Sequence, residues 1–195
     1  DLHANTHSFP TRRSSDLLDW RQSIAPMSEV AGRLAIEAAA FALRKTAGGR
    51  LRLASGSSYT GSTSVDGGVL ALGNAYAGNA YVIASGAALE LDTTSNDFSL
   101  PATSFTGTGT LRKAGQNRAF WGSTAATFAL GSGSLIEVTG GTFVGGSNAN
   151  EVWTNNLSDL SVASGATFDG VEANVRVDGI SGSGTIKTGY SGAGY

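Results

Sequence analysis

The sequence contains no cysteine and only 3 prolines in 195 residues. The lack of cysteine excludes disulfides, zinc–thiolate sites and thiol catalysis. A membrane helix needs an apolar run of about 18 residues or more. No run in this sequence is that long, so we expect no membrane insertion by this chain. Charged residues make up only 14% and hydrophobic residues 41%. Disordered chains show the opposite balance, so the composition favours a folded protein.

Positive charge is scarce over most of the chain. Residues 54–195 contain 5 Lys and Arg against 10 Asp and Glu, a net charge of −5. Binding to phosphates requires clustered positive charge. The sequence therefore predicts no nucleic-acid partner.

Residues 7–17 read HSFPTRRSSDL. This string resembles, residue for residue, the translation of a common sequencing adapter in one frame. We interpret residues 1–17 as an artefactual leader that is not native and that contributes nothing to the core. Both histidines, His3 and His7, belong to this leader.

Glycine is abundant, at 28 of 195 residues. It opens a recurring phrase in which apolar residues alternate with small or polar ones. The phrases begin at Gly49, Gly68, Gly86, Gly109, Gly133, Gly141, Gly165 and Gly184. Successive glycines lie 19, 18, 23, 24, 8, 24 and 19 residues apart. Repetition at such a period indicates a solenoid, in which each unit buries its apolar face by stacking on the next.

The alternation within each phrase predicts which side chains face the core. The expected inward residues are Leu70, Leu72, Leu89, Leu91, Leu111, Leu135, Phe143, Phe168 and Ile186. A β-sandwich joined by hairpins is the alternative, since Asp66-Gly67 and Asp178-Gly179 suit hairpin turns. The regular period favours an all-β solenoid over that sandwich.

Residues 41–72 carry a more specific pattern. The matching positions are Leu43, Lys45, Gly49, Leu51, Leu53, Gly56, Tyr59, Thr60, Gly61, Thr63, Val65, Gly68, Leu70 and Leu72. This segment resembles the autotransporter-associated β-strand repeat, also called the passenger-associated transport repeat. Ala47 departs from the pattern, where the family usually has glycine. Weaker copies begin at Gly107 and Gly182, so the resemblance covers residues 41–187.

The resemblance implies a right-handed parallel β-helix, here a fragment over residues 41–195 that is truncated at its C-terminus. It also implies an extracellular or cell-surface protein, attached to the outer membrane in its full form. The implied function is that of a structural or adhesive passenger. Two alternatives remain: a fragment of a carbohydrate-active β-helix enzyme, and a scaffold for a catalytic domain missing from this chain.

Residues 18–40 do not follow the repeat. Within them, residues 26–40 favour a short helix, with Ser28 as its N-cap and Val30 and Leu34 on one face. The alternative is a damaged first rung, because residues 33–37 also read as a strand.

We expect no catalytic residue, cofactor or metal in this chain, and no enzyme activity. Glycoside hydrolysis requires paired carboxylates. Candidates are Glu90 with Asp92, and Asp169 with Glu172 and Asp178. We interpret the first pair as solvated surface charge, which is the usual place of such residues, whereas the second group is spread over a turn region.

The longest phrases contain a candidate ligand surface, formed by Trp121, Asn148, Asn150, Trp153 and Asn155. Tryptophan next to asparagine suits stacking on a sugar and hydrogen bonding to its hydroxyls. The alternative is that the tryptophans are buried and the asparagines form turns. The expected partners are host or environmental glycans or surface proteins, and open strand edges favour end-to-end self-association.

Overall fold

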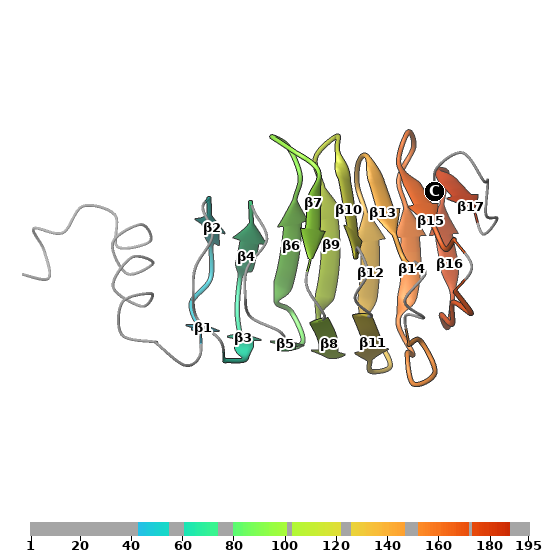
Figure 1. Cartoon of the computed structure of the whole chain (residues 1–195). Coiled ribbons are helices and arrows are strands. Elements are labelled where there is room, and N and C mark those ends of the chain that lie inside the picture. The colour runs from blue at the N-terminus through green and yellow to red at the C-terminus, as the bar shows by residue number, and fades with distance from the viewer. Residues whose placement is uncertain are drawn as a thin grey trace, which may run out of the picture.

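The computed structural model describes residues 43–54, 61–73, 80–100, 103–121, 126–146, 152–171 and 173–187. Within these ranges all strand pairs are parallel and no helix occurs. The strands stack along one axis, as Figure 1 shows. The described part of the chain is therefore a parallel β-helix, which confirms the expected fold class. The expected leader (1–17) and the segment 18–40 lie outside the described residues.

The strands form three sheets, which we call A, B and C. Sheet A contains β1 (Leu43–Lys45), β3 (Thr63–Val65), β5 (Ala80–Ile83), β8 (Thr103–Gly107) and β11 (Ala126–Leu130). Sheet B contains β2 (Arg50–Leu53), β4 (Val69–Leu72), β6 (Ala88–Asp92), β9 (Thr110–Ala114), β12 (Leu135–Val138), β14 (Asp159–Val162) and β16 (Ile180–Gly182). Sheet C contains β7 (Phe98–Leu100), β10 (Arg118–Trp121), β13 (Thr142–Val144), β15 (Thr167–Asp169) and β17 (Thr185–Lys187).

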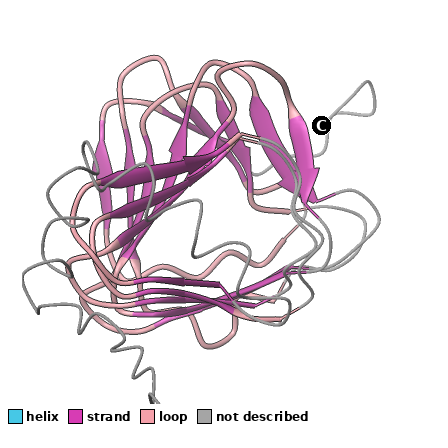
Figure 2. Ribbon diagram, turned by 90° about the vertical axis from the view of Figure 1, so that its left-hand side faces the viewer, coloured by secondary structure: helices cyan, strands magenta, loops and turns pink. Residues whose placement is uncertain are grey.

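From β5 to β13 the chain visits the sheets in the order A, B, C and then returns to A, whereas the described strands alternate between A and B from β1 to β4 and between B and C from β14 to β17. We call each turn of the helix a rung. Figure 2 shows the three sheets arranged around one interior. Because parallel strands cannot be joined by tight hairpins, each rung must travel around this interior before it pairs with its predecessor.

Columns of apolar side chains line the inner face of sheet B. Residues paired in register at the first inward position are Leu51, Leu70, Leu89, Leu111, Ile136 and Leu160. Every one of them except Leu51 is at most 1% exposed. This is the alternation that the glycine-led phrases predict, and it makes one continuous core from rungs that have no core of their own.

Aromatic rings fill the space between sheets A and C. Tyr81, Phe105 and Phe128 occupy one register position on successive strands of sheet A. Their rings stack at centroid distances of 5.5 and 5.4 Å, and Trp153 stacks on Phe128 at 4.0 Å. Trp121 packs edge-on against Phe105 and Phe128. Stacked and edge-on rings each add about 0.5–1.5 kcal/mol beyond the area they bury.

Glycine is required where a corner passes close to the rung before it. Gly68 has φ = 67°, and a Cβ at this residue would lie 2.3 Å from the carbonyl oxygen of Gly49. Gly107 has φ = 99°, and its Cβ would lie 2.1 Å from the carbonyl oxygen of Ile83. Both the backbone angle and the close approach exclude a side chain at these two corners.

Two of the nine residues that were predicted to face inward are not buried. Leu135 is wrong: it pairs with Thr110 at an outward position and is only half-buried, while Ile136 takes the inward place. The reason is the length of the turn. The inward side chain, Ile136, is the third residue after Gly133, whereas Leu70 is the second residue after Gly68. Ile186 pairs in register with buried Phe168 but is 41% exposed on β17.

Candidate functional site

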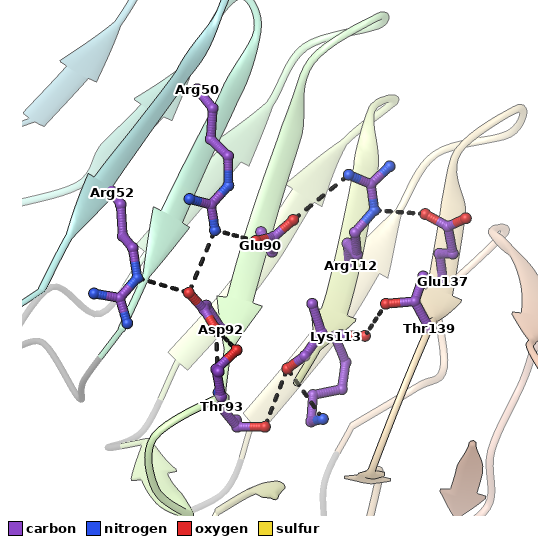
Figure 3. A network of polar contacts seen from close by, with 11 residues as sticks. Arg50, Arg52, Glu90, Asp92, Thr93, Arg112, Lys113, Glu137 and Thr139 are labelled. Atoms are coloured by element: carbon purple, nitrogen blue, oxygen red, sulfur yellow. Dashed lines mark hydrogen bonds and ion pairs between the residues drawn. The ribbon is translucent and has the colours of Figure 1, made fainter. Parts of the chain in front are cut away.

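A network of charged side chains lies on the outer face of sheet B (Figure 3). One outward register position carries Arg52, Ala71, Glu90, Arg112 and Glu137 on five successive strands. We call the six charged residues of this face the charge ladder: Arg50, Arg52, Glu90, Asp92, Arg112 and Glu137. This face contains the first pair of candidate carboxylates from the sequence, so its geometry decides what that pair can do.

Two arginines of β2 reach across β4 to carboxylates on β6. Arg50 Nη2 lies 2.6 Å from Glu90 Oε1 and 3.3 Å from Asp92 Oδ2. Arg52 Nε lies 2.6 Å from the same oxygen of Asp92. Ala71 stands between these strands in the register, and its small side chain is completely buried. The small side chain of Ala71 leaves room for this crossing between Arg52 and Glu90 in the register.

A glycine at the end of β4 serves the same purpose. A Cβ at Gly73 would lie 2.6 Å from Arg52 Nη2. The guanidinium therefore passes directly over the backbone of Gly73 on its way to Asp92.

The network continues on β9 and β12. Arg112 Nε donates to Glu137 Oε2 at 2.6 Å, and Arg112 Nη1 lies 3.6 Å from Glu90 Oε2. Glu90 is thus held between arginines from both sides. Three arginines face three carboxylates, so the ladder carries no net charge near neutral pH.

The surroundings of Asp92 keep it ionised. Burial alone raises the pKa of this carboxyl, but hydrogen bonds from Arg52 and Thr94 outweigh it and hold the pKa well below its ordinary value of 3.8. Thr94 donates to Asp92 Oδ1 from its backbone nitrogen at 3.1 Å and from its hydroxyl at 2.6 Å. The hydrogen bond with Glu90 likewise raises the pKa of Arg50. A general acid near neutral pH needs a raised pKa, so Asp92 is suited to be a fixed anion instead.

The interpretation of the candidate carboxylates as solvated surface charge is wrong for the first pair. Glu90 and Asp92 are 7% and 6% exposed, because arginine side chains cover them. In the second group, Asp169 is 4% exposed and accepts a hydrogen bond from the backbone nitrogen of Val171 at 3.1 Å. Asp178 is exposed, and Glu172 lies outside the described residues.

The candidate ligand surface is wrong for both tryptophans. Trp121 and Trp153 are each 1% exposed, so neither ring can stack on a sugar. Their indole nitrogens are also satisfied internally: Trp121 donates to Thr103 Oγ1 at 2.6 Å, and Trp153 donates to the carbonyl oxygen of Gly145 at 2.9 Å. The structure thus supports the alternative of buried tryptophans.

The asparagines of that surface have different outcomes. Asn155 is exposed in a turn, whereas Asn148 and Asn150 lie outside the described residues. Asn156, next to Asn155, is completely buried and accepts a hydrogen bond from the backbone nitrogen of Leu130 at 3.2 Å. At this position, an asparagine side chain takes the place of a backbone carbonyl in the stack.

The apolar pattern does not identify two lysines that lie in the interior. Lys113 is completely buried at an inward position of sheet B, in register with Leu91 and Val138. Lys45 is 9% exposed at an inward position of sheet A, in register with Val65. The sequence signal is that each lysine follows an inward leucine by two residues, and strands place such residues on one face.

Over the described residues, no helix is long and apolar enough to span a membrane, and no group of three or more histidines or carboxylates is placed to hold a metal ion. Comparison of the chain with models of protein families, with curated proteins and with solved structures finds no match.

Proposed function

We propose that this chain is a structural segment of a secreted or surface-displayed bacterial passenger of the autotransporter type, and that its described rungs form a rigid stalk. The observation that carries the proposal is the charge ladder. Its carboxylates and arginines bind one another across rungs, so they stiffen the stack instead of facing a substrate. The repeat pattern at residues 41–72 supports the passenger assignment.

The buried aromatic stack supports the same role. Rings from four successive rungs stack on one another from Tyr81 to Trp153. Such a column resists bending, since bending would separate rings that are packed face to face. A stalk needs this property, whereas a sugar-binding groove needs its rings exposed.

Polysaccharide turnover tests the structural role directly. We expect no release of reducing sugar or unsaturated product when the chain is incubated with a panel of neutral and acidic polysaccharides. Release that disappears in Glu90→Gln and Asp92→Asn but persists in Glu137→Gln would overturn the proposal and favour a carbohydrate-active enzyme.

Surface display tests the passenger assignment. The chain would be fused between a signal peptide and an autotransporter translocation domain in a Gram-negative host. We expect that it reaches the cell surface and becomes accessible to external protease. Retention in the periplasm, under conditions where a known passenger is displayed, would contradict the assignment.

A further inference from the structure

The ammonium group of Lys113 joins the corners of two consecutive rungs. Lys113 Nζ donates to the carbonyl oxygen of Ala114 at 3.2 Å, at the end of its own strand β9, and to that of Gly115 at 2.9 Å, in the corner that follows β9. It also donates to the carbonyl oxygen of Gly140 at 2.7 Å, which belongs to the corner that follows β12 on the next rung. The three hydrogens of an ammonium are thus matched by three acceptors from two rungs.

Lys45 repeats this arrangement at a different corner. Its Nζ donates to the carbonyl oxygens of Ala47 and Gly48, which follow its own strand β1. It also donates to the carbonyl oxygen of Gly67 at 3.0 Å, on the next rung. The chain has one further lysine, Lys187. Its side chain is 57% exposed and its Nζ lies 3.7 Å from Asp169 Oδ2, so it is not buried as Lys45 and Lys113 are.

The apolar columns leave the register of stacking poorly defined. A shift of one residue between neighbouring strands would turn the core face outward, so it is excluded. A shift of two residues keeps the alternation. It would exchange leucine, isoleucine and valine for one another, at little cost when volumes are similar. At β9 and β12, for example, Leu111 would face Val138 instead of Ile136.

A buried ammonium opposes this two-residue shift. The shift moves the next corner by roughly 7 Å along the strand, since each residue rises about 3.3 Å. The carbonyl of Gly140 would then be out of reach, and Lys113 would keep a buried charge without its full set of acceptors. Burying a charge that is not fully hydrogen-bonded is strongly unfavourable.

We propose that Lys45 and Lys113 set the stacking register of the β-helix, each acting as an ammonium clasp that holds the corner carbonyls of two consecutive rungs together. Buried polar groups have this effect in other architectures, where they select one register at some expense of stability. Each clasp joins the rung of its own lysine to the next rung, and the proposal is independent of the proposed function.

The lysine ammonium signals of the unmodified full chain give the first test. In ¹H–¹⁵N spectra at mildly acidic pH, we expect slowly exchanging ammonium protons for Lys45 and Lys113, with couplings across the hydrogen bond to the carbonyl carbons of Gly67 and Gly140. Lys187 is the internal control and should exchange too fast to be seen. Equal exchange of all three lysines, or no coupling to the next rung, would overturn the proposal.

Disulfide capture gives the second test, because the chain has no cysteine of its own. Thr110 and Leu135 are outward register partners, so Thr110→Cys with Leu135→Cys reports the native register. Thr110→Cys with Glu137→Cys reports a shift of two residues. In-register neighbours lie within the Cα separation that a disulfide spans, about 4.4–6.8 Å.

After refolding in a redox buffer, the native-register disulfide should form in high yield in the unaltered background. Lys113→Met should lower this yield several-fold and raise that of the shifted pair. Leu91→Met, at the neighbouring position of the same column, should change neither. Equal yields in the Lys113→Met and Leu91→Met backgrounds would refute the clasp. If Lys113→Met does not fold, neither disulfide forms and the ammonium spectra decide.

Discussion

Lys113 gives the fold a specific dependence on pH. Burial lowers its pKa from the ordinary 10.5 to about 8, and the nearby carboxylates of Asp97 and Asp92, on the preceding rung, offset only part of this effect. Between these two values the unfolded chain binds a proton that the folded chain has lost. The contribution of Lys113 to the free energy of unfolding therefore rises as the pH goes from about 8 to 10.5.

The prediction is a comparison of the unaltered chain with Lys113→Met. The stability of the unaltered chain relative to the variant should rise by at most about 3 kcal/mol as pH goes from below the folded pKa to above the unfolded one. Urea unfolding of both proteins at a series of pH values measures this difference, and other titrating groups cancel in it. Parallel stability curves would contradict the prediction.

Tryptophan fluorescence tests the burial of both rings. In a Trp20→Phe variant, Trp121 and Trp153 are the only tryptophans. Because both rings lie in the apolar interior, we expect blue-shifted emission that acrylamide does not quench and that added glycans do not change. Emission at long wavelength that responds to a glycan would restore the idea of a sugar-stacking surface.

At the level of strands, the two faces of sheet B should differ sharply in their response to truncation. Leu70 is completely buried, whereas Leu135 is half-buried on the outer face. Leu70→Ala should destabilise the protein by about 2–5 kcal/mol, the usual range for a buried leucine. Leu135→Ala should cost less than about 1 kcal/mol. Urea unfolding measures both, and equal costs would refute the assigned alternation.

The charge ladder should contribute measurably to stability. Glu90 is held between Arg50 and Arg112 and its side chain is only 10% exposed. Glu90→Ala removes the shared partner of two arginines, and we expect a loss of roughly 1–2 kcal/mol that shrinks at high salt. Asp97→Ala is the matched control, since Asp97 pairs with Arg118 at an exposed site and such pairs contribute about 0–1 kcal/mol. Equal losses in the two variants would contradict the role of the ladder.

Much of sheet B can be predicted from sequence, because its strands follow glycine corners with strict alternation. Leu70, Leu89 and Leu111 are all inward as expected. The misplacement of Leu135 comes from the length of a turn, which alternation does not encode. One added residue after a corner glycine reverses the faces of the strand that follows.

The candidate site was harder to predict because it depends on contacts across rungs. Arg50 and Glu90 are 40 residues apart, and nothing local in the sequence pairs them. Lys113 was missed for a related reason: a charged residue in a strand normally points outward. The inward ammonium is stabilised by backbone carbonyls of its own rung and of the next rung. Backbone acceptors are common to all residue types, so they cannot be recognised from the sequence.

At the scale of the whole molecule, stability passes from rung to rung. Each described strand pairs only with its immediate neighbours in its sheet. In such a stack, an appended segment contributes only where it packs against a terminal rung. We therefore expect that deletion of residues 1–17 leaves the thermal midpoint unchanged within error, with the circular dichroism spectrum as a check on folding. A drop of several degrees would show that these residues pack against the β-helix and are part of the protein.

The reach of the two β2 arginines across β4 has a consequence for how such a protein changes length. Repeat proteins grow and shrink when their genes gain or lose whole units. A unit inserted between β4 and β6 would carry Glu90 and Asp92 one strand farther from Arg50 and Arg52, leaving Asp92 without both of its arginines and Glu90 with Arg112 alone. An insertion between β14 and β16, where Ser161 faces Ser181, separates no charged pair of the ladder. Duplication and loss of units should therefore be tolerated on the β14–β16 side and selected against within the span from β2 to β12.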